Sequence, residues 1–359
     1  MIHQAQKLQN QYHIKLFGSA WSPPAWMKTS HQLNEGAIRG KPGEKYYQLF
    51  AEYLVCFLNE YSNRNTSIWG LTVLNEPDIC HEHDPKFPSI CLSMNGIQQR
   101  DFIKHNLGPL LFGSANKTGH HKDLILMAYD FNLDHIENFV TPILTDPEAS
   151  KYIAGIGFHW YSTNDATRRQ LDNIHQRYPN KFLLATEASL IGKGVGNGDW
   201  AKFNHYVDDI MKDLNQNSVG WVDWSLAKDP QGNPNWVHSP VDPAVIIDPS
   251  VPEYIKQPMY YAVGHFSRFI PPGSIRLHHS LLTIQQKHST ETSEATEVIY
   301  HSPTIQVTVF SRPDNGTVVQ VFNPTKHPYT ILIHDHDHHN NSMMAIVEAE
   351  ALKTFIYYY

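Results

Sequence analysis

The stretch Leu71-Thr-Val-Leu-Asn-Glu-Pro-Asp78 is an apolar run that ends abruptly at a carboxylate, and Leu183-Leu-Ala-Thr-Glu-Ala-Ser189 repeats the pattern. Short continuous apolar runs are typical of strands buried in a parallel sheet. In parallel α/β folds the functional residues gather where such strands end. Glu76 and Glu187 both follow an apolar run, so the two stretches predict a parallel sheet with two carboxylates at its carboxyl edge.

The same kind of apolar run recurs on either side of these stretches, from residue 13 to about residue 270. Segments with helical periodicity lie between the runs, which predicts repeated β/α units. The expected strands are His13–Ser19, Ser67–Leu74, Leu124–Tyr129, Gly155–Trp160, Phe182–Thr186 and Gly220–Ser225.

Two of the helical segments carry a clear apolar stripe. In the first, Tyr46, Phe50, Tyr53, Phe57 and Tyr61 fall on one side, and we expect this side and Cys56 to face the core. In the second, the stripe consists of Phe203, Val207, Ile210 and Leu214.

The pattern changes after Pro271-Pro-Gly273, where short β-like runs follow one another about ten residues apart. Such spacing predicts a small antiparallel β-sandwich. We therefore expect two domains, residues 1–272 and residues 273–359. The expected strands of the second are Ile275–His279, Thr296–Tyr300, Ile305–Phe310, Val318–Phe322, Tyr329–His334, Met343–Glu348 and Thr354–Tyr358.

Composition and charge exclude several classes of function. The 359 residues are 41% hydrophobic and 18% charged, which is enough to bury a large core. The sequence has no apolar stretch near 20 residues that would span a membrane, and a net charge of −7 argues against a nucleic-acid binder. The motifs of serine hydrolases, phosphate loops and zinc peptidases are absent from the sequence. We expect no cofactor and no metal, and the histidine tract 334–339 lacks the ligand spacing of a known site.

Histidine is abundant, with 23 residues against 28 lysines and arginines. Because exposed histidines become charged near pH 5, this indicates a protein of an acidic compartment, although ordinary surface polarity explains it equally well. Asn65, Asn116, Asn315 and Asn340 begin glycosylation sequons. Of the three cysteines, only Cys80 and Cys91 form a plausible disulfide.

A pair of carboxylates at two strand ends indicates glycoside hydrolysis. A retaining glycosidase needs one carboxyl to protonate the leaving oxygen and another, about 5 Å away, to attack the anomeric carbon. Either glutamate alone would be read as a solvated loop residue; the two together favour the catalytic interpretation. Asn75 places an amide beside Glu76 that can hold a sugar hydroxyl.

Aromatic residues gather at the same strand ends, where a sugar ring could stack on them. Packing against the surrounding helices is the alternative for each. These residues are Trp21, Trp160, Tyr161, Trp221 and Trp224.

Several longer motifs resemble the glucosylceramidases of glycoside hydrolase family 30, and the resemblance covers essentially the whole chain. The motifs are Ser19-Ala-Trp-Ser-Pro-Pro-Ala-Trp-Met-Lys-Thr29, Leu74-Asn-Glu-Pro77, His159-Trp-Tyr161, Thr186-Glu-Ala188 and Gly220-Trp-Val-Asp-Trp-Ser-Leu-Ala227.

The resemblance implies a (β/α)8 TIM barrel with a β side domain, and a retaining hydrolase that cleaves glucosylceramide into glucose and ceramide. Carried over by position, it implies that Glu76 is the acid/base and Glu187 the nucleophile. It further implies a saposin-type activator, an anionic membrane surface and a lysosomal lumenal location. The residues implied for substrate binding are Trp21, Asn75, Tyr161 and Trp224 in the glucose pocket and Phe87 at the lipid-facing entrance.

In this alignment Met1 corresponds to the end of the second barrel helix, so the resemblance implies a barrel that lacks roughly its first two β/α units and the leader. Closure is what removes exposed edges from a barrel. We therefore expect this chain alone to fold poorly and to have little activity. Another family 30 β-glycosidase and a catalytically impaired glycolipid-binding fragment remain the alternatives.

Overall fold

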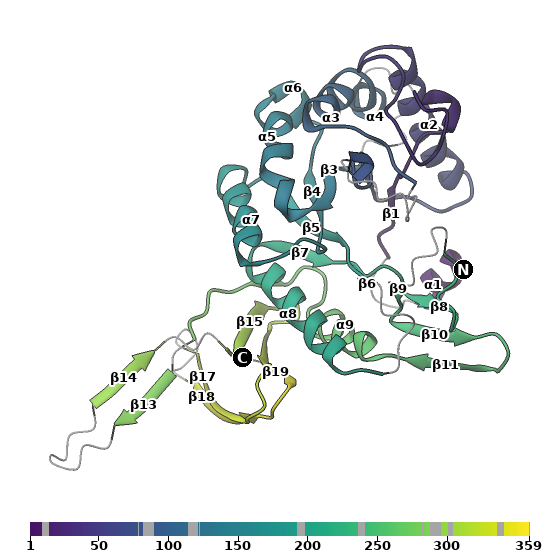
Figure 1. Cartoon of the computed structure of the whole chain (residues 1–359). Coiled ribbons are helices and arrows are strands. Elements are labelled where there is room, and N and C mark those ends of the chain that lie inside the picture. Colours follow the sequence, from purple (N-terminus) through teal and green to yellow (C-terminus); the bar gives the residue numbers. More distant parts are fainter. Residues whose placement is uncertain are drawn as a thin grey trace. The chain divides into compact units, whose positions relative to one another are not determined.

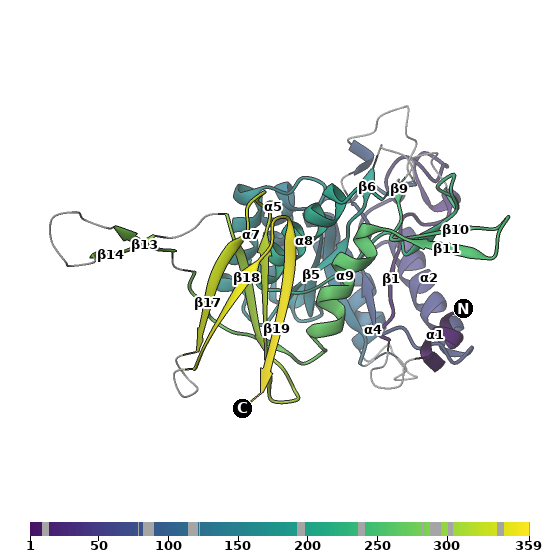
Figure 2. The ribbon, with the colours of Figure 1, turned by 90° about the horizontal axis from the view of Figure 1, so that it is seen from below.

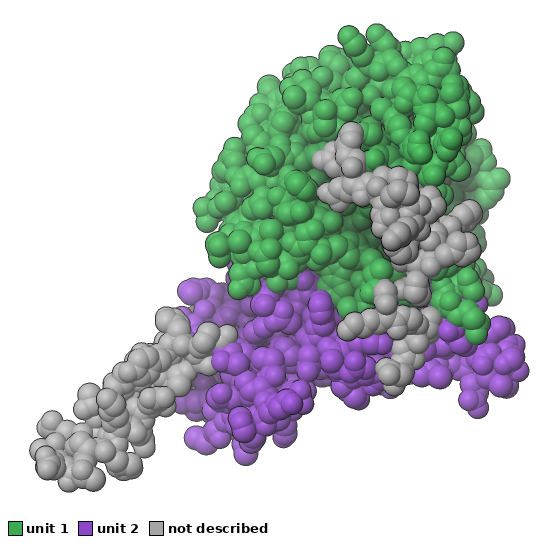
Figure 3. All heavy atoms as spheres, viewed as in Figure 1, with its two compact units in different colours: residues 1–194, 216–225, 231–242 green, residues 195–215, 226–230, 243–359 purple. Residues whose placement is uncertain are grey.

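The computed structural model describes residues 1–8, 14–77, 79–81, 90–113, 121, 123–191, 198–235, 241–281, 283–287, 296–300, 304–335 and 341–358. The chain forms two compact units (Figure 3). Unit 1 consists of residues 1–194, 216–225 and 231–242, and unit 2 of residues 195–215, 226–230 and 243–359. The domain boundary after residue 272 stays a prediction.

Unit 1 is built on one parallel sheet of six strands in the order β1-β2-β3-β4-β5-β7. All six strands expected from the sequence are present, and β3 continues three residues beyond its expected end. The strands are β1 (Phe17–Ser19), β2 (Gly70–Thr72), β3 (Ile125–Asn132), β4 (Gly155–His159), β5 (Phe182–Glu187) and β7 (Ser218–Trp221).

The sheet is curved into a half-barrel, and the helices of unit 1 lie along its outer side (Figure 1). Within the described residues β1 pairs only with β2, and β7 only with β5, so these two strands end the sheet. A short antiparallel pair, β6 (Leu190–Ile191) and β9 (Val241–Asp242), follows β5. The helices are α1 (Ile2–Leu8), α2 (Lys45–Ser62), α3 (Gly96–Phe102), α4 (Gly108–Phe112), α5 (Ile136–Thr145), α6 (Pro147–Ser150) and α7 (Asp165–Arg177), with short turns η1 (Ala25–Met27), η2 (Ile79–His81) and η4 (Leu133–His135) and the π-helical η3 (Ile103–Leu107).

The buried side of α2 differs from the expected stripe. Tyr53 is 50% exposed, Tyr61 is 39% exposed, and Cys56 is exposed, so the expectation that these residues face the core is wrong. The two possible stripes share Phe50 and lie about one residue apart around the helix. The stripe with leucines is the buried one, because leucine has no polar group that must stay hydrated, whereas tyrosine has a hydroxyl. The buried residues are Tyr47, Phe50, Ala51, Leu54 and Leu58.

The described residues of unit 2 form two helices and mostly antiparallel strands. In α8 (Ala201–Asn215) the predicted stripe is buried as expected. The second helix is α9 (Pro258–Phe269), and a three-stranded sheet, absent from the sequence-based expectations, joins β8 (Ala227–Lys228), β10 (Val245–Asp248) and β11 (Glu253–Lys256).

The C-terminal strands confirm the predicted antiparallel side domain. A four-stranded sheet in the order β12-β15-β16-β19 packs through Val319 and Val321 against Val347 of the β17–β18 pair (Figure 2). All seven expected strands are present, with β13 in addition. The strands are β12 (Ile275–Arg276), β13 (Thr283–Lys287), β14 (Thr296–Tyr300), β15 (Gln306–Ser311), β16 (Gly316–Asn323), β17 (Tyr329–Asp335), β18 (Asn341–Val347) and β19 (Ala351–Tyr358).

The predicted disulfide between Cys80 and Cys91 is present, with the two Cα atoms 5.8 Å apart. Two of the four sequons lie in described turns: Asn65 and Asn315 have φ angles of 55° and 63°. Asn116 and Asn340 lie outside the described residues. None of the helices that the structure describes has the length and apolar character needed to cross a membrane.

The start of α3 leaves no room for a side chain at Gly96. A Cβ atom there would lie 2.3 Å from the backbone oxygen of Phe139 in α5, and a backbone atom cannot rotate away. We expect Gly96→Ala to lower the free energy of unfolding by about 1–3 kcal/mol.

Gly264→Ala in α9 is the matched control, because a Cβ there meets no atom within 4 Å. It should be neutral or stabilising by up to ~1 kcal/mol, since alanine is the better helix former. Urea denaturation of the purified variants measures both values, and equal stability of the two would contradict the close approach of α3 and α5.

Candidate active site

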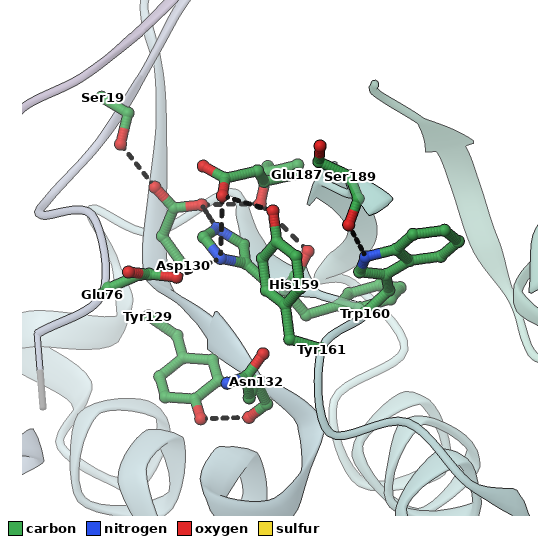
Figure 4. Close-up of polar contacts among 12 residues, drawn as sticks. Ser19, Glu76, Tyr129, Asp130, Asn132, His159, Trp160, Tyr161, Glu187 and Ser189 are labelled. Atoms are coloured by element: carbon green, nitrogen blue, oxygen red, sulfur yellow. Dashed lines mark hydrogen bonds and ion pairs between the residues drawn. The ribbon is translucent and has the colours of Figure 1, made fainter. Parts of the chain in front are cut away.

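The two predicted glutamates lie at the carboxyl edge of the sheet, after β2 and at the end of β5, with β3 and β4 between these strands. Glu187 is the last residue of β5. Glu76 follows β2 by four residues, and its backbone N–H donates to the carbonyl oxygen of Asp130 at 2.9 Å. Glu76 adopts a φ angle of 42°, which is rare for a residue with a side chain. This turn aims the Glu76 carboxyl toward β4 and β5 (Figure 4).

One histidine, His159 at the end of β4, lies between the two glutamates. Its Nδ1 is 3.1 Å from Glu76 Oε1 and 3.9 Å from Glu187 Oε1. The His159 side chain is 1% exposed, whereas the two glutamate side chains are 12% and 11% exposed. The carboxyls therefore reach solvent while the imidazole that connects them does not.

The two carboxyls are close enough to act on one bond. One carboxylate oxygen of each glutamate and one nitrogen of His159 all lie within 4.8 Å of one another. Retaining glycosidases hold their carboxyls about 5–5.5 Å apart, whereas inverting enzymes leave about 6.5–9.5 Å for a water molecule. The arrangement fits direct attack by one carboxylate on a sugar carbon.

A third carboxylate, Asp130 of β3, contacts the far side of His159. His159 Nε2 is 3.2 Å from Asp130 Oδ1, and the Asp130 side chain is 1% exposed. Asp130 also accepts hydrogen bonds at 2.6 Å from Ser19 of β1 and from Thr186 of β5. The hydroxyl of Thr72 in β2 donates in turn to Ser19 at 2.7 Å. Every strand from β1 to β5 thus contributes a side chain to this network.

Asp130 and His159 each stabilise the charged form of the other. Burial disfavours the carboxylate of Asp130, but hydrogen bonds from His159, Ser19 and Thr186 outweigh it and hold the pKa of Asp130 below its usual range. Burial also disfavours the His159 cation, yet hydrogen bonds with Asp130 and Glu76 and the charge of Glu187 raise the pKa of His159 well above 6.5. These contacts therefore favour the protonated, cationic form of the His159 ring.

Glu187 keeps its proton to an unusually high pH. Burial is the main cause that raises its pKa to about 7; the charge of Glu76 adds to this, and the charge of His159 and the hydrogen bond from Tyr161 oppose it.

Glu76, His159 and Glu187 are also the group of described residues with the spacing of a metal site. Metal ligation needs a free lone pair on the imidazole. In this structure His159 Nδ1 lies 3.1 Å from Glu76 Oε1, so a hydrogen bond to Glu76 uses the ring atom that a metal ion would need. The donor set fits an acid/base pair better than a metal centre.

Several residues predicted to bind substrate lie beside the glutamates. The Tyr161 hydroxyl donates to Glu187 Oε1 at 2.9 Å. The rings of Trp21 and Trp224 meet edge to face at 5.2 Å, and Asn75 is 3% exposed. Phe87 lies outside the described residues, so its place at the entrance stays a prediction.

Trp160 and Trp221 fit the alternative interpretation, in which the aromatic rings pack within the fold. Trp160 is 7% exposed, and its ring meets Trp221 edge to face at 5.9 Å. Its indole N–H donates to the carbonyl oxygen of Ser189 at 3.1 Å, which fixes the segment after Glu187.

Sequence reasoning missed Asp130 and the role of His159. The signal for Asp130 was available: it directly follows the apolar run Leu124–Tyr129, as the glutamates follow theirs. The role of His159 depends on its two neighbours in space, which no spacing in the sequence indicates.

Comparison with known proteins gives a consistent result. The Glycosyl hydrolase family 30 TIM-barrel domain matches residues 1–270. The chain is 35% identical to the lysosomal acid glucosylceramidase of Mus musculus, over 94% of this chain and 61% of that protein. It is also 35% identical to putative glucosylceramidase 1 of Caenorhabditis elegans, over 90% of this chain and 58% of that protein. The chain thus spans about three-fifths of the length of these relatives.

Among solved structures, SrfJ from Salmonella typhimurium has a similar fold, with a TM-score of 0.82 and 21% identity. The alignment covers 100% of this chain and 72% of SrfJ. The barrel architecture expected from the family resemblance is therefore supported by both sequence and structure.

The raised pKa of Glu187 makes stability depend on pH. Between pH 4.5 and about 7 the folded protein keeps a proton that the unfolded chain has lost, so the free energy of unfolding falls as pH rises through this window. A rise of the pKa from 4.5 to about 7 contributes at most ~3 kcal/mol. We expect Glu187→Gln to reduce the stability difference between pH 4.5 and pH 7.5 by up to that amount, measured by urea denaturation.

Glu52→Gln serves as the control, because Glu52 is exposed on α2. It should leave the pH dependence of stability unchanged. A Glu187→Gln variant with the same pH dependence as the parent chain would show that Glu187 ionises normally.

Proposed function

The chain belongs to glycosyl hydrolase family 30, and from that premise we propose that it is a retaining β-glucosidase that hydrolyses glucosylceramide to glucose and ceramide by double displacement. The observation that carries the proposal is the close approach of Glu76 and Glu187 around His159, with oxygens within 4.8 Å.

In the first step Glu187 is the nucleophile and Glu76 the acid. A carboxylate oxygen of Glu187 bonds to the anomeric carbon while the bond to the glycosidic oxygen breaks, and Glu76 gives its proton to that oxygen, so ceramide leaves as an alcohol. In the second step Glu76 takes a proton from water, the water oxygen bonds to the anomeric carbon, and Glu187 is released as a carboxylate. These two steps require that Glu76 carries a proton and Glu187 is ionised when the substrate binds.

Tyr161 and His159 both contact Glu187 and favour its ionised form. The Tyr161 hydroxyl donates to Glu187 Oε1 at 2.9 Å, which fixes the carboxylate and leaves its other oxygen for attack. The His159 cation lowers the pKa of Glu187 against the opposing effect of burial. Both contacts favour the ionised nucleophile that attack on the sugar requires.

The glucose ring would bind among Trp21, Trp224, Asn75 and Tyr161. The backbone N–H of Trp224 donates to the carbonyl oxygen of Ala188 at 2.7 Å, which ties the Trp224 segment to the residue after the nucleophile. Indole faces bind the apolar faces of sugars, and the Asn75 amide can bind a hydroxyl. Phe87 is proposed for the entrance that receives the lipid chains.

The setting proposed for this activity is sphingolipid catabolism in the lysosomal lumen, with a saposin-type activator and an anionic membrane surface as partners. The similarity to the lysosomal acid glucosylceramidase of Mus musculus supports it. The abundance of histidine and the glycosylation sequons at the Asn65 and Asn315 turns agree with such a lumenal protein.

Substitution of the two glutamates tests the mechanism. Glu187→Gln should lower kcat for an aryl β-glucoside by roughly 10⁴-fold or more, because it removes the nucleophile. Glu76→Gln should lower it by about 10²–10⁴-fold, and less for a dinitrophenyl glucoside, whose leaving group needs no acid. Glu52→Gln on the outer surface is the control.

Product analysis by NMR during the reaction tests retention. The first-formed sugar should be the β anomer. Release of α-glucose as the first product would contradict direct attack by a carboxylate.

A different sugar specificity within the family is the second candidate, because the loops at strand ends determine which substrate is accepted and vary most among relatives. We expect kcat/KM for glucosylceramide to exceed that for the galactosyl and xylosyl analogues by roughly 10-fold or more. A reversed order would assign the chain to another β-glycoside.

A catalytically impaired glycolipid-binding protein is a further candidate, favoured by the two strands, β1 and β7, that end the described sheet. Under this alternative the parent chain binds glucosylceramide vesicles without turnover, and Glu187→Gln binds them equally. Measurable turnover that Glu187→Gln abolishes excludes it.

A further inference from the structure

Asp130 occupies an irregular and strained position in an otherwise regular strand. The register between β3 and β4 passes from Tyr129–Gly157 to Phe131–Phe158, so Asp130 is the extra residue of a β-bulge. Tyr129 and Asp130 have φ angles of 72° and 81°. Such angles are unfavourable for residues with side chains, and bulges of this kind redirect a side chain next to a functional site.

The bulge lets Asp130 contact both Glu76 and His159. Its backbone oxygen accepts the N–H of Glu76 at 2.9 Å, which fixes the turn that carries the Glu76 carboxyl. Its carboxylate lies 3.2 Å from His159 Nε2, opposite the Nδ1 that faces Glu76 and Glu187. In a regular strand the backbone of residue 130 would pair with β4. Residue 130 could then not contact both the Glu76 N–H and His159.

The surroundings of Asp130 are shaped for a charged carboxylate. Ser19 donates to one of its oxygens and Thr186 to the other, both at 2.6 Å. Gly157 of β4 leaves the space: a Cβ atom there would lie 3.1 Å from Asp130 Oδ1 and 3.0 Å from Thr186 Cγ2. Two donors and a missing side chain therefore orient the carboxylate toward the histidine (Figure 4).

We propose that Asp130 is a positioning residue that holds His159 as a doubly protonated ring between Glu76 and Glu187, and so opposes the uptake of a proton by the nucleophile. This inference rests on the proposed function, since the pH range in which Glu187 is ionised matters only if Glu187 attacks a substrate.

The groups that face His159 explain why the charge of Asp130 affects the ionisation of Glu187. Asp130 of β3, Glu76 after β2 and Glu187 of β5 present carboxylates to the ring, and the Tyr161 ring lies edge to face at 6.0 Å. Without the charge of Asp130, burial would favour the neutral ring. Glu187 would then lose a neighbouring cation and would take up a proton at a higher pH.

Asp130→Asn keeps the size of the side chain and removes its charge. We expect the acid limb of the kcat/KM profile for an aryl β-glucoside to move to higher pH by about 1–3 pH units, as for a carboxyl that loses a cationic neighbour. A merely structural role would lower kcat/KM evenly across the profile. Asp134→Asn, at a partly exposed carboxyl of η4, is the control and should leave the profile unchanged.

The state of His159 can be observed without catalysis. Nitrogen-15 NMR of histidine-labelled protein, with the His159 signals assigned from a His159→Gln variant, should show both ring nitrogens protonated in the parent chain up to pH 7.5 and a neutral ring in Asp130→Asn. A neutral His159 at pH 7 in the parent chain overturns the proposal, even if Asp130→Asn does not fold.

The two experiments separate failure of this inference from failure of the function. A parent chain that hydrolyses no β-glucoside contradicts the proposed function, while its NMR spectrum still decides the state of His159. An active chain whose acid limb is unmoved in a folded Asp130→Asn variant contradicts the role of Asp130 alone.

Discussion

A cation buried among carboxylates needs a partner for each of its hydrogen-bonding groups, and the Asp130–His159 contact meets that need in this protein. Both side chains are 1% exposed, so neither charge is stabilised by water. Removing one partner from such a pair leaves an unpaired buried charge, which is far more costly than an exposed ion pair. The positions of Glu76 and Glu187 follow from this contact, because both carboxyls face the imidazole that Asp130 holds.

The parallel sheet explains how so many polar groups reach one point. Strands that run in the same direction end at the same edge, so residues distant in sequence become neighbours there. Each of five strands supplies one polar side chain, and the sixth leads to Trp224. The network is therefore a property of the whole sheet, and a change of register in any strand would remove one of its members.

Much of this arrangement could be predicted from the sequence, and the exceptions have physical reasons. Apolar runs located all six barrel strands and both glutamates, because burial on two faces demands such runs. The face of α2 was misjudged, since an aromatic stripe and an aliphatic stripe lie side by side and periodicity alone does not rank them. The β-bulge at Asp130 escaped prediction because it depends on pairing with β4, and so did the imidazolium it supports.

In the proposed mechanism Glu187 bonds covalently to the sugar during turnover. The most direct test is mass spectrometry of the chain after incubation with a dinitrophenyl β-glucoside that carries fluorine in place of the C2 hydroxyl, which slows release of the intermediate. We expect one added fluoroglucosyl group on the peptide that contains Glu187. A label on the Glu76 peptide, or an active chain that accumulates no label, would contradict it.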